Sequence, residues 1–290
     1  MIGEGFLVFD GTPADGSASA YFDAIRLHWE NRIAEVDLIT AKIDDEAFGT
    51  EARDEDFYGL FGQAQGGALY LLHRNKRKAT TSASGVIHPE RRTTAAGGRW
   101  AHVPPEGMHL ALEGAYQTGE YDGRDQRGAG GIFHWGWTAR WESRPRVEVG
   151  GLVLSGDDPG TKRHEGWDGF YAEWPKYSEL LVYTMYDNTT RIPDDDAGTW
   201  ANLRAWWLEG RVEIRPNVRA SIRATRLAAI ERSGPGDGTI RGNLLALRAD
   251  FGLLEGLDGQ LLGEYFEPGD FYSSGADPAW YGRWQVTARF

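Results

Sequence analysis

Hydrophobic and polar residues alternate along most of this chain. Residues 132–142, IFHWGWTARWE, show the pattern most clearly: aromatic side chains recur at odd positions from Phe133 to Trp141, while His134 and Arg140 fall at even positions. Successive side chains of a β-strand point to opposite faces, so this spacing predicts a strand with one apolar and one polar face. Similar segments are residues 24–30, 108–117, 218–225 and 279–290.

The last of these segments, residues 279–290, raises the question of which face is inside. Trp280 and Trp284 lie on its apolar face, and Arg283 and Arg289 lie on its polar face. In a soluble sandwich the apolar face packs a core. In a membrane barrel the apolar face meets lipid and the polar face lines a wet lumen. The connections between the segments decide between the two.

Short and long connections alternate along the chain. The short ones are 30–32, 63–66, 103–107, 143–145, 215–217 and 255–258. The long ones are 10–17, 43–55, 75–90, 118–126, 155–198, 232–238 and 268–278. Up-and-down barrels of the outer membrane place tight turns at one end and long loops at the other. A soluble sandwich has no reason to keep this order, so the alternation favours the membrane barrel.

We therefore predict an all-β fold, a transmembrane antiparallel up-and-down β-barrel of about 14 strands, with 12–18 as alternatives. The predicted crossings lie near 3–9, 18–30, 32–42, 56–63, 67–74, 91–102, 107–117, 127–142, 145–154, 199–214, 218–231, 239–254, 259–267 and 279–290. The barrel is expected to be one domain over residues 1–290, with its longest extracellular loop at about 155–198. Residues 177–186, YSELLVYTMY, also resemble a strand, and we place them as a hairpin or fold inside that loop.

Composition narrows the alternatives further. No stretch approaches 18 consecutive apolar residues, which excludes a transmembrane helix, and mean hydropathy is −0.50. Cysteine is absent, so disulfides and thiolate metal sites are excluded. Tryptophan is abundant, with 12 residues that concentrate near the ends of predicted strands, as interfacial aromatic girdles do. The start, MIGEGFLVFD, has no basic region followed by an apolar run, so we expect that this segment is not a signal peptide.

Several motifs resemble outer-membrane porins of the alginate export family. They are GEGFLVFDGTPADGSASAYFDAIRLHW near the start, EGAYQTGEYDG at 113–123, VLSGDDP at 153–159, and EYFEPGDFYSSGADPAWYGRWQVTARF at the end. The resemblance covers essentially the whole chain, with the motifs in the same order. It implies passive export of an anionic polysaccharide such as alginate through an arginine-rich lumen in the bacterial outer membrane. It implies no catalytic step.

The chain departs from the family pattern at its start. Family barrels have about eighteen strands and begin with several hairpins before a segment like GEGFLVFDG, which here lies at the N-terminus. About four strands are therefore expected to be missing relative to the family. We interpret the chain as the C-terminal portion of the family barrel, either a fragment or a smaller barrel with a narrower pore.

Arginine greatly outnumbers lysine among the 31 basic residues. Rings of arginine in a low-dielectric pore favour anions, and the guanidinium fork can hold a carboxylate by two hydrogen bonds. The predicted lumen-lining arginines, which bind substrate in this interpretation, are Arg26, Arg99, Arg140, Arg204, Arg219, Arg223, Arg248, Arg283 and Arg289. The alternative is that these arginines pair with carboxylates and only rigidify a water-filled wall.

The acidic excess, which gives a formal net charge of −12, lies mostly in the long loops. Residues 44–56, DDEAFGTEARDED, are the densest run, and 194–196 are all aspartate. These loops are either solvated charge or a site that binds Ca²⁺ or bridges to lipopolysaccharide through divalent ions. No other cofactor is expected. The other expected partners are outer-membrane lipid and, through the C-terminal aromatic Phe290, the barrel assembly machinery.

Three alternative functions remain. A general or small-anion porin would share every feature above but would conduct small solutes instead of a polysaccharide. A soluble carbohydrate-binding β-sandwich would use its tryptophans to stack sugars and would not depend on detergent. A barrel hydrolase would need a Ser, His and acid in contact, and the chain has no G-x-S-x-G motif. No basic run with interleaved aromatics suggests nucleic acid.

Overall fold

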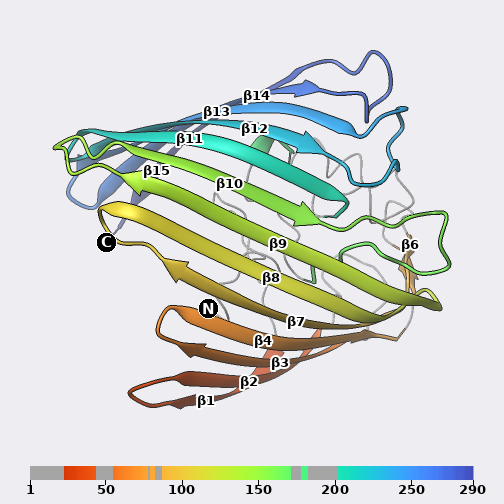
Figure 1. Ribbon diagram of the computed structural model, residues 1–290. Coiled ribbons are helices and arrows are strands. Elements are labelled where there is room, and N and C mark those ends of the chain that lie inside the picture. Colours follow the sequence, from red (N-terminus) through yellow and green to blue (C-terminus); the bar gives the residue numbers. More distant parts are fainter. Residues whose placement is uncertain are drawn as a thin grey trace.

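The computed structural model describes residues 23–43, 55–77, 79–81, 87–170, 178–181 and 201–289. Thirteen strands form one antiparallel sheet in which each strand pairs with its neighbours along the chain (Figure 1). They are β1 (Asp23–Glu30), β2 (Glu35–Ile43), β3 (Glu55–Ala64), β4 (Gly67–Lys76), β7 (Arg91–His102), β8 (Gly107–Tyr121), β9 (Arg124–Thr138), β10 (Arg146–Leu154), β11 (Leu203–Arg215), β12 (Val218–Ala228), β13 (Ile240–Leu254), β14 (Leu257–Pro268) and β15 (Ala279–Ala288). The two-residue strands β5 (Thr80–Thr81) and β6 (Ile87–His88) form a separate pair in the connection from β4 to β7.

The sheet curls into a cylinder that is not closed by pairing between β1 and β15 in the described part of the chain (Figure 1). The predicted all-β, antiparallel, up-and-down fold is confirmed. Each of the last thirteen predicted crossings corresponds to one strand of this sheet. The first predicted crossing, 3–9, lies outside the described residues.

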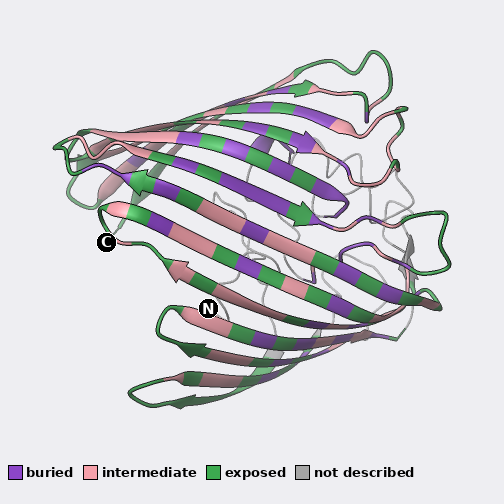
Figure 2. Ribbon diagram, viewed as in Figure 1, coloured by how far each residue is buried: buried purple, intermediate pink, exposed green. Residues whose placement is uncertain are grey.

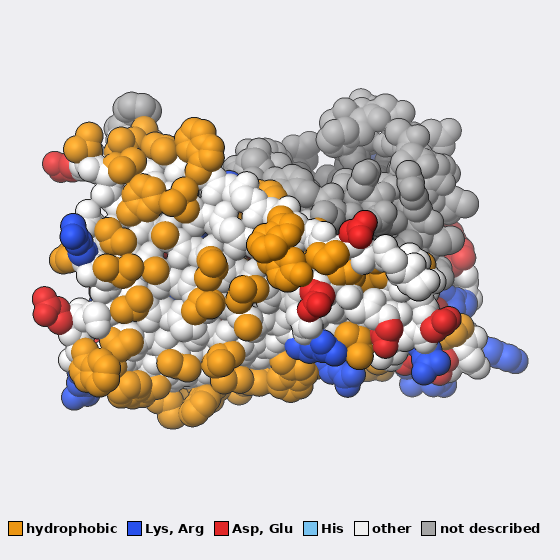
Figure 3. Space-filling view, turned by 90° about the horizontal axis from the view of Figure 1, so that it is seen from above, with side chains coloured by type: hydrophobic (Ala, Val, Ile, Leu, Met, Phe, Trp, Pro, Cys, Tyr) orange, Lys and Arg blue, Asp and Glu red, His pale blue; other side chains and the backbone are white. Residues whose placement is uncertain are grey.

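Side chains alternate between the two faces of the sheet, and Figure 2 shows the alternation of buried and exposed positions along the strands. On β15, Trp280 and Trp284 are 78% and 75% exposed on the convex face, and Arg283 lies on the concave face. Figure 3 shows hydrophobic side chains over the middle of the outer surface and charged ones toward its two ends. This is the outside of a barrel whose middle band meets lipid. Among the described residues no helix is long and apolar enough to cross a membrane.

Two local predictions were wrong. The predicted long loop 118–126 is a two-residue turn, because β8 runs to Tyr121 and β9 begins at Arg124. Asp122 and Gly123 both have positive φ, 50° and 74°, as the tight turn of a hairpin requires. The strand pattern of residues 177–186 is also not borne out where the structure describes it, since residues 179–181 are helical.

Candidate functional site

A row of arginines crosses the concave face of the sheet from β10 to β15. In each pair of neighbouring strands, the pairing register places one inward-facing residue directly opposite another. Following these pairs from strand to strand traces a row across the wall. The row consists of Arg146, Arg211, Ser221, Arg248, Leu262 and Arg283, one residue from each strand. Neighbouring strands are about 4.8 Å apart, so the four guanidinium groups share one band of the wall.

Each arginine of this row forms an ion pair with a carboxylate. The pairs are Arg146–Glu148 at 2.6 Å, Arg211–Glu209 at 3.0 Å, Arg248–Asp250 at 2.8 Å and Arg283–Glu179 at 2.8 Å. The side chains of Arg211 and Arg248 nevertheless remain 38% and 47% exposed toward the interior. A guanidinium has five N–H donors, so one carboxylate leaves donors for a second anion. Each arginine of the band therefore has a carboxylate partner, and two of the four keep partly exposed side chains.

Glu148 lies at the centre of a buried group beside the arginine row. His109 Nε2 and His134 Nδ1 lie 3.2 and 3.0 Å from its carboxylate oxygens, and Trp207 Nε1 donates at 3.4 Å. With the Arg146 pair, four side chains from four strands converge on this carboxylate. These four contacts compensate the negative charge of Glu148, which would otherwise be costly to bury.

The connection from β10 to β11 folds onto the concave face instead of staying outside. Asp168 is buried. It forms an ion pair with Arg74 on β4 at 2.8 Å and accepts a 3.2 Å hydrogen bond from the Thr93 hydroxyl on β7. Gln117 on β8 bonds both the Asp168 N–H and its carbonyl, at 2.8 and 2.5 Å. Trp167 then packs over the bare backbone of Gly130 on β9. Residues 155–170 therefore line the interior along four strands.

The charge on Asp168 is stabilised by these contacts. Burial would raise the pKa of this carboxyl, but Arg74, Arg91, the Phe170 N–H and the Thr93 hydroxyl outweigh that effect and hold the pKa below its ordinary value. The attachment is thus fully formed above the ordinary pKa of an aspartate, about 3.9, and is lost as the pH falls through the lower folded value.

A second described piece of the same connection contacts a distant part of the wall. The Ser178 hydroxyl and the Leu180 N–H donate to the Glu264 carboxylate on β14 at 2.8 and 2.7 Å. Glu179 accepts from Tyr281 and pairs with Arg283 on β15. Four strands, β10 to β13, separate this wall from β9. The two described pieces of the connection therefore contact two separate walls of the cylinder from its concave side.

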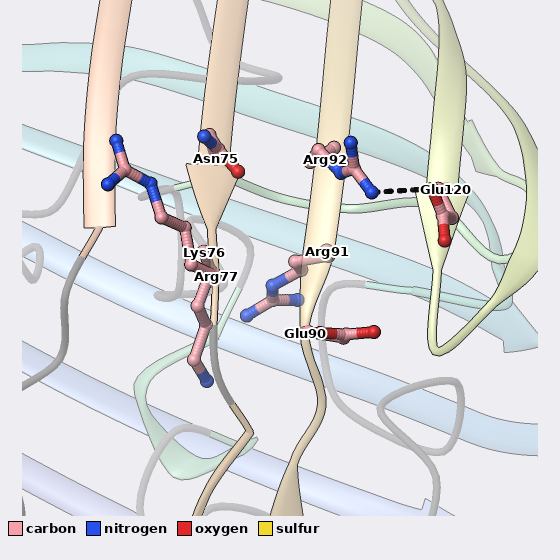
Figure 4. Close-up of a pocket in the computed structure, with 7 residues that line it drawn as sticks. All are labelled: Asn75, Lys76, Arg77, Glu90, Arg91, Arg92 and Glu120. Atoms are coloured by element: carbon pink, nitrogen blue, oxygen red, sulfur yellow. Dashed lines mark hydrogen bonds and ion pairs between the residues drawn. The ribbon is translucent and has the colours of Figure 1, made fainter.

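A hollow of about 290 Å³ lies at the long-loop end of β4 and β7 (Figure 4). Four cationic and two acidic side chains line it, together with one amide. These residues are Asn75, Lys76, Arg77, Glu90, Arg91, Arg92 and Glu120. Arg92 pairs with Glu120 at 3.0 Å, as the dashed line in Figure 4 marks. The rim of the barrel therefore carries more positive than negative side chains at this point.

The structure places the nine predicted arginines in three settings. Six lie on the concave face: Arg26, Arg99, Arg219, Arg223, Arg248 and Arg283. Arg140 lies in the turn after β9, beside Glu106, and Arg289 follows β15 and pairs with Asp258 at 3.0 Å. Arg204 was assigned to the wrong face: it is exposed on the convex side of β11 with Trp206 and Leu208.

Four important cations were missed from the sequence: Arg74, Arg91, Arg146 and Arg211. The signal for Arg146 was present, because Val147, Val149 and Val153 mark the opposite face of β10. Arg74 and Arg91 gave no comparable signal, since their partner Asp168 is 94 residues from Arg74. The predicted acidic Ca²⁺ loop at 44–56 lies almost wholly outside the described residues, so that site stays a prediction.

Comparison with known proteins agrees with this architecture. The family model described as Alginate export matches residues 16–284. Among solved structures, the fold is similar to OccK11 (OpdR) of Pseudomonas aeruginosa, with 12% identity and a TM-score of 0.56 over 99% of this chain and 74% of that one. OprD of P. aeruginosa has 10% identity and a TM-score of 0.58, over 99% and 72%.

OccAB1 of Acinetobacter baumannii has 9% identity and a TM-score of 0.59, over 97% of this chain and 71% of that one. At these identities the structural likeness concerns the fold alone. No match was found among the curated proteins. The family match, which spans nearly the whole chain, carries the assignment: this chain belongs to the alginate export family and is a β-barrel porin of the bacterial outer membrane.

Proposed function

We propose that this porin passively conducts anionic solutes and that its substrate is an anionic polysaccharide such as alginate. The arginine row across β10 to β15 is the observation that carries the proposal. A polyuronate bears one carboxylate on each sugar, and a band of guanidinium groups offers it successive bidentate partners. Because each arginine already has a carboxylate neighbour, the polymer would be held weakly enough to move on.

The path would run between the wall and the inward connection. Arg211, Arg219 and Arg248 are the row and near-row arginines with the most exposed side chains, 38%, 49% and 47%. They project from the part of the wall between the two attachments of the long connection, at Asp168 and Glu264. We therefore assign these three arginines the main contact with a passing anion.

A second candidate is a general porin for small solutes. The ion pairs Arg146–Glu148, Arg211–Glu209 and Arg248–Asp250 favour it, because they leave the wall nearly neutral. Such a channel would conduct ions with little preference and would not distinguish charged from neutral saccharides. Neither candidate involves a catalytic step.

Replacing Arg211 and Arg248 together by alanine is expected to make the channel markedly less selective for anions. The change removes two positive charges from the path and leaves Asp250 and Glu209 in place, the latter still paired with Arg223, so the local field becomes less positive. The measurement is the reversal potential of single channels under a salt gradient. Arg204→Ala is the control, since it removes one arginine charge from the convex face of the same wall.

The proposal fails if the double variant and Arg204→Ala have the same reversal potential as the unchanged protein. The predicted contacts with lipopolysaccharide, with Ca²⁺ and, through Phe290, with the assembly machinery stay predictions. Phe290 lies outside the described residues.

A further inference from the structure

A tryptophan on the concave face lies over a glycine of the neighbouring strand. Gly150 on β10 is paired directly with Trp207 on β11. A Cβ atom placed on Gly150 would lie 2.0 Å from Trp207 Cζ2 and 2.1 Å from Cε2, closer than real atoms approach. The φ of Gly150 is outside the left-handed range, so its backbone does not require glycine. Glycine is needed at this position because any side chain would overlap the indole ring of Trp207.

The same arrangement occurs on another part of the wall. Gly97 on β7 is paired directly with Tyr70 on β4, and a Cβ on Gly97 would lie 2.4 Å from Tyr70 Cζ. The Tyr70 hydroxyl donates to Glu113 at 3.2 Å. In both pairs a large ring lies against the wall instead of projecting into the interior, and its polar atom reaches a buried carboxylate.

The indole of Trp207 also supports a charged group. The guanidinium of Arg223 lies over this ring, with its Cζ 5.8 Å from the ring centre, and its Nε donates to Glu209 at 2.7 Å. A cation over an indole face is attracted by the ring quadrupole. Gly150, Trp207 and Arg223 therefore form three layers, from the backbone of the wall toward the interior.

We propose that Gly150 keeps the Trp207 indole flat against the wall and so keeps the conducting path wide at the level of Glu148. A methyl group on Gly150 displaces the indole. His134, whose ring centre lies 5.1 Å from that of Trp207, and Glu148 occupy the wall beside it. The ring therefore moves into the interior and takes Arg223 with it. This inference rests on the porin fold and not on the identity of the solute, since conductance in simple salt measures width whether or not uronates bind.

The test compares single-channel conductance in potassium chloride for Gly150→Ala, Trp207→Ala and the double variant. We expect Gly150→Ala to lower conductance clearly, because the displaced ring narrows the path. Trp207→Ala should change it little, because a ring lying against the wall blocks little of the path. In the double variant the added methyl has no ring to displace, so conductance should return to the Trp207→Ala level. Gly263→Ala, on the convex face with open space around its Cβ, is the matched control and should match the unchanged protein.

Two results would overturn the inference. One is a folded Gly150→Ala channel that conducts like the unchanged protein. The other is that adding Gly150→Ala lowers conductance by the same amount in the Trp207→Ala variant as in the unchanged protein. If Gly150→Ala alone fails to assemble, the inference requires that Trp207→Ala restore assembly in the double variant, and failure of both would contradict it.

Discussion

Replacing Arg74 by methionine should detach residues 155–170 from the wall and raise single-channel conductance. Arg74 lies between two buried carboxylates, Glu55 at 3.1 Å and Asp168 at 2.8 Å. Removing one partner of a buried ion pair costs about 3–5 kcal/mol. Without Arg74, Asp168 keeps the longer 3.7 Å ion pair with Arg91. Glu55 belongs to β3 and stays in the sheet. Asp168 belongs to the connection, so it can regain contact with water when the 155–170 segment leaves the wall.

Arg92→Met is the matched control for this prediction. Arg92 forms its ion pair with Glu120 on an exposed surface, where such a pair contributes only about 0–1 kcal/mol. Cleavage by chymotrypsin after the buried residues Trp167 and Phe170 reports the detachment independently of conductance. Equal conductance and equal protection in the two variants would show that the Asp168 contacts do not hold the segment in the path.

The second large effect is expected from one charge on the lipid face. Leu261 and Leu262 are neighbours near the middle of β14, and Leu261 is paired with Trp284 on the convex face while Leu262 is paired with Arg283 on the concave face. Leu261→Lys should lower the free energy of unfolding by about 2–4 kcal/mol, the cost of a lysine at the bilayer midplane. Leu262→Lys should cost much less, because its side chain meets water.

Urea unfolding of both variants in lipid vesicles measures this difference. The two substitutions are chemically identical and one position apart, so general effects of lysine on the strand cancel. Equal losses of stability, or a larger loss for Leu262→Lys, would contradict the assignment of the convex face to lipid.

Alternation predicted the strands well because most of the wall meets lipid on one side and water on the other. Trp280, Arg283 and Trp284 could be placed on their faces from the sequence alone, and the structure agrees. The order of short and long connections then gave the up-and-down topology. Among the connections whose strands the structure describes on both sides, only the hairpin at Asp122 interrupts the predicted order, because β8 and β9 continue farther than their apolar patterns suggest.

The same rule failed on β11, for a physical reason. Leu203 and Ala205 are buried on the concave face in one hydrophobic cluster with Trp167 and Phe170 of the inward connection. Trp207, farther along the same face, lies against Gly150 of β10. Where the interior is filled by protein, the inner face becomes apolar as well, and both faces of the strand carry hydrophobic residues. That is why Arg204 was placed inside.

The inward attachment of the long connection could not be predicted either. Asp168 is one of many acidic residues in the long connections, and its partners on β4, β7 and β8 are 51 to 94 residues away. Nothing in the local pattern distinguishes it. The missed arginines Arg74 and Arg91 belong to the same long-range arrangement, whereas Arg146 and Arg211 belong to a row that depends on strand register.

The most direct test of the proposed function is block of single-channel current by oligo-uronates in a planar bilayer. Neutral oligosaccharides of the same length are the control for size. The proposal predicts anion-selective channels that uronates block at lower concentrations than neutral saccharides do, with the difference lost in the Arg211→Ala/Arg248→Ala variant. Open channels that uronates and neutral saccharides block equally would contradict it and would leave a general porin.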